Sequence, residues 1–208
     1  MTDQTEKTSL SAAYAVETAE DARKLYADWA EGYEAEMREN GYAAPARCAE
    51  ALARVMTDTS APVLDLGCGT GLSGAALIEA GFSVVDGTDF SSEMLEVARR
   101  KGIYRNLMQG DLENPLQAEK GDYSAISAIG VFSPGHAPAE LIDQAVALLP
   151  RGGCMVFTLN DHALADGSYT GRVRELVDTG WAMLRVKEKG PHMPGAGIEA
   201  EVYVLQKA

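Results

Sequence analysis

The chain has 208 residues, of which 46% are hydrophobic and 24% are charged, and its formal net charge is −13. This composition is that of an ordinary globular protein, and the acidic balance argues against a duplex nucleic acid as partner, because proteins that bind duplexes present a basic face. No apolar run approaches the roughly 20 residues that cross a bilayer, and the polar N-terminus does not resemble a signal peptide. Cys48, Cys68 and Cys154 have neither metal-ligand spacing nor an even count for disulfides. We therefore expect a cytoplasmic protein without a metal site.

The first 44 residues predict a helical extension. Their large apolar residues recur every four positions, at Leu25, Trp29, Tyr33 and Met37, which is one stripe of a helix. A break is expected at Gly32 or at Asn40-Gly41. The stripe either packs on the rest of the protein or lets Trp29 and Tyr33 cover a ligand as a lid, and the spacing alone favours packing. We expect residues 1–44 to form the extension and residues 45–208 the main domain.

From Pro45 onward, predicted strands alternate with predicted helices. We expect helices at residues 45–56, 70–80, 92–101, 139–149 and 168–179. We expect strands at residues 63–66, 82–88, 104–108, 123–129, 154–159, 181–187 and 198–206, with loops at 160–167 and 190–197. Alternation of this kind predicts a mostly parallel sheet with helices on both faces, and the final hairpin adds an antiparallel C-terminal strand. The expected fold class is α/β, a Rossmann-like, doubly wound, seven-stranded sheet.

The stretch from Val63 to Gly71 organises the chain. It reads Val-Leu-Asp-Leu-Gly-Cys-Gly-Thr-Gly, which is a short strand, a tight glycine loop and the start of a helix. Glycines at such a turn let a ligand approach the backbone closely. Three aspartates close successive strands: Asp65, Asp89 and Asp111. Because ligands of open α/β sheets bind beyond these strand ends, the three together indicate a nucleoside ligand.

Each aspartate suits a different part of a nucleoside. Asp89 is placed to hold both ribose hydroxyls, and Asp111 to accept a hydrogen bond from the adenine amino group. Asp65 could receive an ammonium group or hold the glycine loop. A nicotinamide-dependent dehydrogenase is the main competitor, because Gly69 to Gly74 matches the dinucleotide fingerprint and Asp89 lies near the expected distance. Against it, a carboxylate at Asp65 would serve an anionic pyrophosphate poorly.

The glycine stretch resembles the first motif of class I S-adenosylmethionine-dependent methyltransferases. The later motifs of this family resemble, in order, Gly87–Ser91 with Glu93–Leu95, Gly110–Leu112, Ile126–Phe132 and Leu149–Gly153. The segments Asp28–Glu34 and Gly102–Tyr104 look closest to small methyltransferases like the one encoded in the human Williams–Beuren region. The resemblance covers the chain from about Asp28 to its C-terminus.

The resemblance implies S-adenosylmethionine as cofactor, with the glycine loop under its methionyl part. It implies that Phe90 or Met94 lies against adenine, that Ile129 backs the sulfonium end, and that Trp29 or Tyr33 closes the site. The cofactor-binding residues that it implies are Trp29, Tyr33, Asp65, Gly67, Cys68, Gly69, Gly71, Asp89, Phe90, Met94, Asp111, Leu112 and Ile129.

Methyl transfer from a sulfonium is a direct displacement, which mainly needs alignment and exclusion of water. A general base is needed only if the nucleophile carries a proton. His136, on the loop after the fourth strand, is the best-placed candidate base, and His162 and His192 have less support. Tyr169 and Asn160 could line the substrate pocket.

No Asn-Pro-Pro-Tyr or Asp-Pro-Pro-Tyr stretch follows the fourth predicted strand, so the resemblance favours a small molecule or a protein side chain as methyl acceptor. A non-catalytic protein that binds S-adenosylmethionine for a partner is the third alternative, and the oligomeric state is open.

Overall fold

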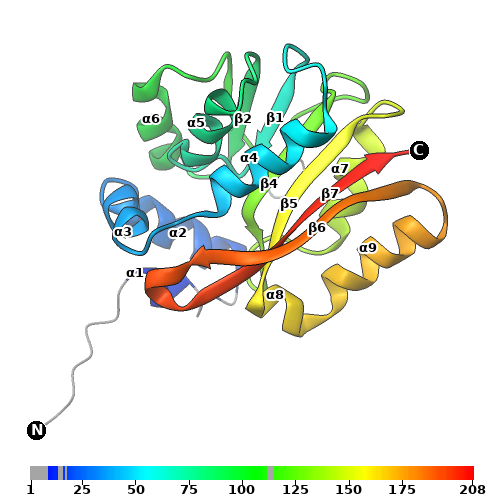
Figure 1. Ribbon diagram of the computed structural model, residues 1–208. Helices are drawn as coiled ribbons and strands as arrows, with labels where there is room; N and C mark the ends of the chain where they lie inside the picture. The colour runs from blue at the N-terminus through cyan, green and yellow to red at the C-terminus, as the bar shows by residue number, and fades with distance from the viewer. Residues whose placement is uncertain (1–8, 14–15, 17, 112–114) are drawn as a thin grey trace, which may run out of the picture.

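A computed structural model describes residues 9–13, 16, 18–111 and 115–208. Seven strands of the described part form one sheet in the order β3-β2-β1-β4-β5-β7-β6 (Figure 1). The strands are β1 (Val63–Leu66), β2 (Val85–Asp89), β3 (Leu107–Gln109), β4 (Ala125–Phe132), β5 (Cys154–Asn160), β6 (Ala182–Met193) and β7 (Ile198–Lys207). β7 runs antiparallel to both of its neighbours, and the other pairs are parallel. The predicted fold, including its antiparallel C-terminal strand, is therefore confirmed.

Helices cover both faces of the sheet and one of its ends. They are α1 (Ser9–Ala13), α2 (Ala19–Trp29), α3 (Tyr33–Glu39), α4 (Ala44–Val55), α5 (Leu72–Glu79), α6 (Ser92–Lys101), α7 (Glu140–Leu148), α8 (Asp161–Asp166) and α9 (Ser168–Asp178), with a 3-10 turn, η1, at Pro194–Ala196. None of the helices in the described part of the chain is both long and apolar enough to cross a membrane.

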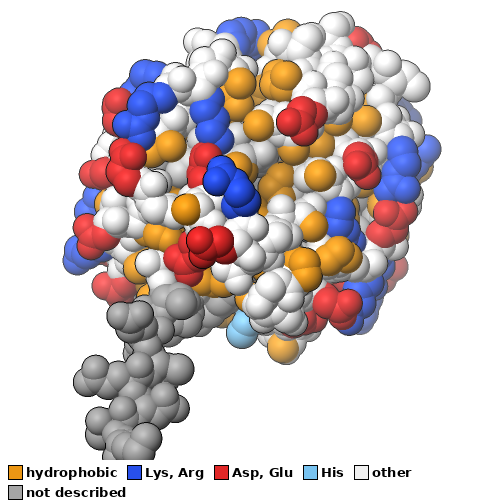
Figure 2. Space-filling view, turned by 60° about the vertical axis from the view of Figure 1, so that its left-hand side comes forward, with side chains coloured by type: hydrophobic (Ala, Val, Ile, Leu, Met, Phe, Trp, Pro, Cys, Tyr) orange, Lys and Arg blue, Asp and Glu red, His pale blue; other side chains and the backbone are white. Residues whose placement is uncertain are grey.

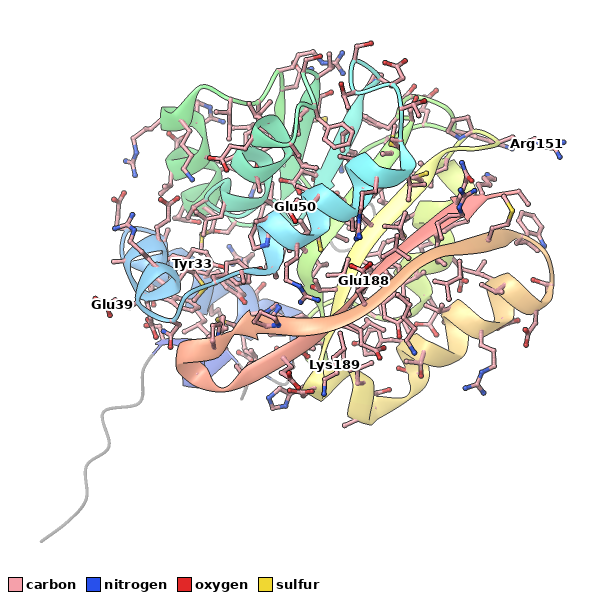
Figure 3. All side chains as sticks on the ribbon, in the orientation of Figure 1. Tyr33, Glu39, Glu50, Arg151, Glu188 and Lys189 are labelled. Atoms are coloured by element: carbon pink, nitrogen blue, oxygen red, sulfur yellow. The ribbon has the colours of Figure 1, made fainter. Side chains whose placement is uncertain are left out.

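One apolar core lies on each face of the sheet. α4 and α5 pack on one face, where Leu52 and Leu77 meet strand residues such as Val63 and Val156. α7 and α9 cover the other face. The long strand β6 is tied to α4 by an ion pair between Arg54 and Glu188 at 2.7 Å; Figure 3 labels Glu188 beside α4. These layers hold the strand ends rigidly, which is what a binding site at those ends requires.

The helices α1 to α3 form a small third core over the end of the sheet. Trp29 and Met37 are buried there against Met193, next to the tip of the β6–β7 hairpin (Figure 1). The predicted break at Gly32 is confirmed, since it separates α2 from α3. The division at residues 44 and 45 stays a prediction, although α4 begins at this point.

Ion pairs join the N-terminal helices to the C-terminal end of α6. Lys101 pairs with Glu34 at 2.6 Å and Arg100 with Glu31 at 2.7 Å. The basic cluster after Ala98 therefore links two layers in addition to complementing the helix dipole. On the face shown in Figure 2, acidic and basic side chains are interspersed, so this face carries no broad basic area.

Several predicted element boundaries are wrong; β2 and β3, for example, begin three residues later than the strands expected at residues 82–88 and 104–108. Residues 161–166 form helix α8 rather than a loop, because the Asn160 side chain accepts a hydrogen bond from the Ala163 N–H and so caps a helix. β4 continues to Phe132, with a register shift against β5 after Ala128. β6 continues to Met193, because pairing with β7 extends along the expected loop.

Candidate cofactor and active site

A cavity lies beyond the carboxyl ends of β1, β2 and β4, where the strand order reverses. The glycine loop after β1 and the ends of β2 and β4 form its walls, and α2 and α3 lie over it. Tyr33, labelled in Figure 3, lies between these helices and the body of the domain. The described lining residues are Tyr26, Tyr33, Leu66, Gly67, Gly69, Thr88, Asp89, Phe90, Met94, Gly110, Asp111, Pro115, Ile129, Gly130, Val131, His136, Ala137, Pro138 and Leu141.

Asp89 is the carboxylate at the centre of this wall. Its Oδ2 accepts the Gly69 N–H and its Oδ1 accepts the Ser91 N–H, both at 2.9 Å. Burial raises the pKa of the Asp89 carboxyl to about 6, with a smaller contribution from the nearby Asp65 carboxyl, while the backbone donors act to lower it. Asp89 therefore joins the glycine loop to the start of α6, and each carboxylate oxygen retains capacity for a further donor.

Asp65 lies behind the glycine loop, and among the described residues it is not part of the cavity wall. It is fully buried and accepts three hydroxyl hydrogen bonds, from Ser73 (2.6 Å), Tyr104 (2.8 Å) and Ser127 (2.8 Å). Burial raises the pKa of the Asp65 carboxyl, and the three hydroxyls oppose this rise. This placement favours the second of the two expected roles, in which Asp65 holds the loop, and direct contact of Asp65 with a cofactor stays a prediction.

Tyr104 explains why several glycines surround the loop. A Cβ atom at Gly74 would lie 2.3 Å from the Tyr104 hydroxyl, and one at Gly71 or Gly87 would lie 3.1 Å from its ring. These glycines make the space through which Tyr104 reaches Asp65. Gly71 and Gly74 thus make room for an aromatic ring, so no pyrophosphate is needed to explain these two glycines.

The structure places Cys68 and Gly71 on the far side of the glycine loop, and their contact with a cofactor stays a prediction. In the described part of the chain neither residue lines the cavity. A Cβ at Gly87 would lie 2.8 Å from the Cys68 sulfur, so the Cys68 side chain packs on β2. Gly71 precedes α5 with a left-handed φ of 94°. Both residues shape the loop from its far side.

Gly67 gives a direct test of the loop. Its φ is +66°, and a Cβ there would lie 2.6 Å from Cγ2 of Val131 in the cavity wall. Gly67→Ala is expected to destabilise the protein by about 2–3 kcal/mol, combining the cost of a left-handed alanine with the clash. Adding Val131→Ala to the Gly67→Ala variant should recover only the part of the lost stability that is due to the clash. Urea unfolding measures the free energy of unfolding of both variants.

The matched control is Gly152→Ala. Gly152 also has a positive φ, +82°, but a Cβ there would meet no atom within 4 Å. Gly152→Ala should therefore lower the free energy of unfolding by only about 1–2 kcal/mol, the cost of the left-handed backbone alone. Equal losses at Gly67 and Gly152 would contradict the close approach of Gly67 to Val131.

The remaining predicted residues divide into three groups. Those that line the cavity are Tyr33, Gly67, Gly69, Asp89, Phe90, Met94, Asp111, Ile129 and His136. Trp29 lies instead in the core of the N-terminal helices, where it packs on Tyr33 with ring centroids 4.8 Å apart. Leu112 lies outside the described residues. Cofactor contact by the lining residues stays a prediction.

His136 is positioned by a tyrosine and a serine. Its Nε2 lies 3.2 Å from the Tyr26 hydroxyl, and its Nδ1 lies 3.0 Å from Ser133 Oγ and 3.4 Å from the Pro134 carbonyl oxygen. Because a carbonyl oxygen only accepts, this contact favours a proton on Nδ1 and leaves Nε2 to accept from Tyr26. Burial lowers the pKa of His136, so the ring is neutral at pH 7 and can take a proton. Tyr26 had no sequence signal beyond its place on α2.

Comparisons with known proteins agree with this geometry. The methyltransferase domain family matches residues 63–153. These residues are therefore similar to a methyltransferase domain. Human methyltransferase-like protein 27 is 34% identical over 136 residues, which are 63% of this chain and 56% of that protein.

The methyltransferase domain has further relatives. Trans-aconitate 2-methyltransferase from Azoarcus is 37% identical over 109 residues, 52% of this chain and 42% of that enzyme. The crystal structure of magnesium protoporphyrin IX methyltransferase from Synechocystis with bound S-adenosylmethionine superposes with a TM-score of 0.65 at 16% identity, over 89% of this chain and 97% of that one. The chain spans about half the length of the curated relatives that it matches.

Proposed function

We propose that the protein is a methyltransferase that moves the methyl group of S-adenosylmethionine to a small molecule or a protein side chain. The observation that carries this proposal is the placement of Asp89 in a cavity at the switch point of a methyltransferase domain. A carboxylate at that strand end suits the two hydroxyls of an unphosphorylated ribose. The apolar wall beside it, with Phe90 and Met94, suits adenine.

The residues present fit such a cofactor. Gly67 and Gly69 line the cavity without side chains, which allows the methionyl part to lie close to the backbone. Asp111 lies beside the adenine wall, and Ile129 borders the position proposed for the sulfonium. The bound cofactor supplies an electrophilic methyl group. The chain's own residues align it and exclude water through α2 and α3.

His136 is the proposed general base for an acceptor that carries a proton. Its neutral ring lies at the cavity edge with Nε2 held by Tyr26. A base contributes only if proton removal accompanies methyl transfer. We also propose a cytoplasmic location, supported by the three cysteines, which all lie in the described part of the chain and are free and buried.

Cofactor binding should depend on pH through Asp89. The pKa of this carboxyl is raised from 3.8 to about 6 in the folded protein. The ionised Asp89 carboxylate therefore lowers the stability of the folded protein above pH 6, and this loss disappears as the pH falls from 6 to 3.8. Hydroxyl donors prefer the carboxylate, so binding should release a proton. Affinity for S-adenosylhomocysteine should fall by up to about tenfold per pH unit below 6, as titration calorimetry can measure. A flat profile from pH 7 to 5 would contradict this role.

Titration calorimetry of the full chain tests the proposed function. S-adenosylmethionine and S-adenosylhomocysteine should bind, and NADH should not. Release of S-adenosylhomocysteine over a panel of small molecules and peptides then tests turnover. Failure of both sulfur nucleosides to bind would contradict the proposal. Binding without turnover on any acceptor would instead favour the non-catalytic binding protein.

A further inference from the structure

A second, smaller chamber adjoins the cofactor cavity. It lies between the N-terminal helices, the loop after β4, the end of β5 and the tip of the β6–β7 hairpin. The described lining residues are Leu10, Ala13, Tyr26, Trp29, Tyr33, Met37, Tyr42, Gly130, Ser133, His136, Asn160, His192 and Met193. Tyr26, Tyr33, Gly130 and His136 line both spaces, so the two meet at the end of β4. Ile129, which lies beside the position proposed for the sulfonium, immediately precedes Gly130, one of these shared residues.

The chamber wall is aromatic and uncharged. Among its described residues there is no lysine, arginine, aspartate or glutamate. Its polar groups are the hydroxyl of Ser133, the amide of Asn160, two histidines and tyrosine hydroxyls. An ionic group placed in this chamber would have no opposite charge in the described wall, and desolvating it without such a partner is unfavourable.

His192, which lines this chamber, has a ring nitrogen that lacks a hydrogen-bond partner in the described part of the protein. Only 2% of the residue is exposed, and its Nδ1 is buried without a hydrogen-bond partner in the described part of the protein. Its ring packs edge-on against Tyr42, with centroids 5.2 Å apart. Burial, followed by the positive charge of Arg47, lowers the pKa of His192 to about 4, so the ring is neutral at pH 7. A buried neutral polar atom without a partner destabilises the protein, and a ligand that hydrogen-bonds to it recovers that loss.

We propose that this chamber holds the methyl acceptor, and that the acceptor is a neutral phenol whose hydroxyl group hydrogen-bonds to Nδ1 of His192. The inference rests on the proposed methyltransferase function. A hydroxyl group both donates and accepts, so it satisfies either tautomer of His192. Its aromatic ring suits the tyrosine and tryptophan side chains of the wall. A carboxylate or an ammonium group would lie there without an opposite charge among the described side chains that line the chamber.

The phenolic class also suits the proton balance. The acceptor oxygen forms a bond to the methyl carbon while the carbon–sulfur bond breaks, and the phenolic proton passes to the Tyr26 oxygen as the Tyr26 hydroxyl proton moves to Nε2 of His136. The products are a methyl ether, a neutral thioether and an imidazolium that returns its proton to solvent. A phenol, with a pKa of about 10 in water, gives up this proton to a neutral histidine far more readily than an aliphatic alcohol does.

Binding selectivity tests the acceptor class in the wild-type protein. The full chain, saturated with S-adenosylhomocysteine, is titrated with catechol, benzoate and benzylamine, which are matched single-ring probes with neutral, anionic and cationic head groups. Catechol should bind at least about tenfold more tightly than the other two, since each would bury an unpaired charge. Equal or tighter binding of benzoate or benzylamine would overturn the proposal.

Substitutions at His192 test the contact itself. His192→Leu should weaken catechol binding by about tenfold, the effect of one buried hydrogen bond, while S-adenosylhomocysteine affinity stays unchanged. His192→Asn places an amide near the position of Nδ1 and should restore most of the affinity. The control His162→Leu alters an exposed histidine of α8 and should change neither ligand.

The outcomes separate this inference from the proposed function. If S-adenosylhomocysteine fails to bind the wild-type chain, the proposed function is wrong. If it binds and catechol does not, or if His192→Leu leaves catechol affinity unchanged, only the phenol proposal is wrong. Retained S-adenosylhomocysteine affinity in each variant also shows that the variant is folded.

Discussion

Replacing Asp89 by asparagine is expected to weaken S-adenosylhomocysteine binding by about tenfold to a hundredfold at pH 7.5, because hydrogen bonds to a charged acceptor contribute about 1.5–3 kcal/mol. The carboxylate lies in the cavity wall, and its two oxygens already accept the N–H groups of Gly69 and Ser91. An asparagine can keep only one of these backbone donors, since its amide nitrogen donates. The loss should therefore combine weaker ribose recognition with a loosened glycine loop. Titration calorimetry gives the affinity.

Two measurements isolate the ribose contact of Asp89. The pH dependence of affinity between pH 7 and 5 should disappear in Asp89→Asn, because the titrating group is gone. The matched control is Asp122→Asn, an exposed aspartate whose Oδ2 accepts only the Glu119 N–H at 2.8 Å. It lies before β4, at the opposite end of the sheet from the cavity, and should bind like the wild type. An Asp89→Asn variant with wild-type affinity would remove Asp89 from the site.

Elements with strong local signals were predictable from the sequence. The Ser91 side chain accepts from the Met94 N–H and begins α6, and Gly102 ends it with a φ of 64°, as the residue pattern predicted. β1 has the predicted bounds because it is a short apolar run between Pro62 and the glycine loop. The extension of β6 to Met193 was not predictable in this way, since it depends on pairing with β7 rather than on local preference.

The same distinction applies to the site. Asp89 and Asp111 line the cavity because each ends or follows a parallel strand, a property that strand order alone decides. The position of Asp65 is equally local, but its role depends on hydroxyls that come from distant parts of the chain, at Ser73, Tyr104 and Ser127. Sequence spacing does not reveal such a convergence, so the residue pattern alone left open whether Asp65 serves the ligand or the loop.

The second chamber shows the limit of sequence reasoning most clearly. Both Asn160 and Tyr169 were expected to line a substrate pocket, and this stays a prediction. Asn160 lines the chamber that we propose for the acceptor, and Tyr169 is buried against Ala137 and Phe132. His192 had little support because it reaches the chamber on a hairpin far along the chain from α2 and α3. Its interest arises only from burial and from an unpartnered ring nitrogen, which are tertiary properties.

Replacing Asp65 by alanine should destabilise the protein strongly while affecting the cofactor less than Asp89→Asn does. The substitution removes the acceptor of three buried hydroxyl groups and leaves a cavity, so we expect a loss of about 3–5 kcal/mol in the free energy of unfolding. For a domain of this size that is a fall of roughly 10 °C in Tm. Calorimetric and urea unfolding would measure it. The Asp65 carboxyl should stabilise the protein through its hydrogen bonds with the hydroxyl groups of Ser73, Tyr104 and Ser127.

Three companion variants separate that network from a direct role in binding. Ser127→Ala removes one of the hydroxyl groups and should cost about 1 kcal/mol. Asp65→Asn keeps the side-chain volume, and because hydroxyl groups can rotate to accept from its amide, it should be less damaging than Asp65→Ala. The control Asp58→Ala removes an exposed turn aspartate bonded to Ser60 and should cost less than about 1 kcal/mol. If Asp65→Ala were as stable as the wild type yet lost cofactor affinity, the carboxylate would act on the ligand directly, and the hydroxyl network would have to open when the ligand binds.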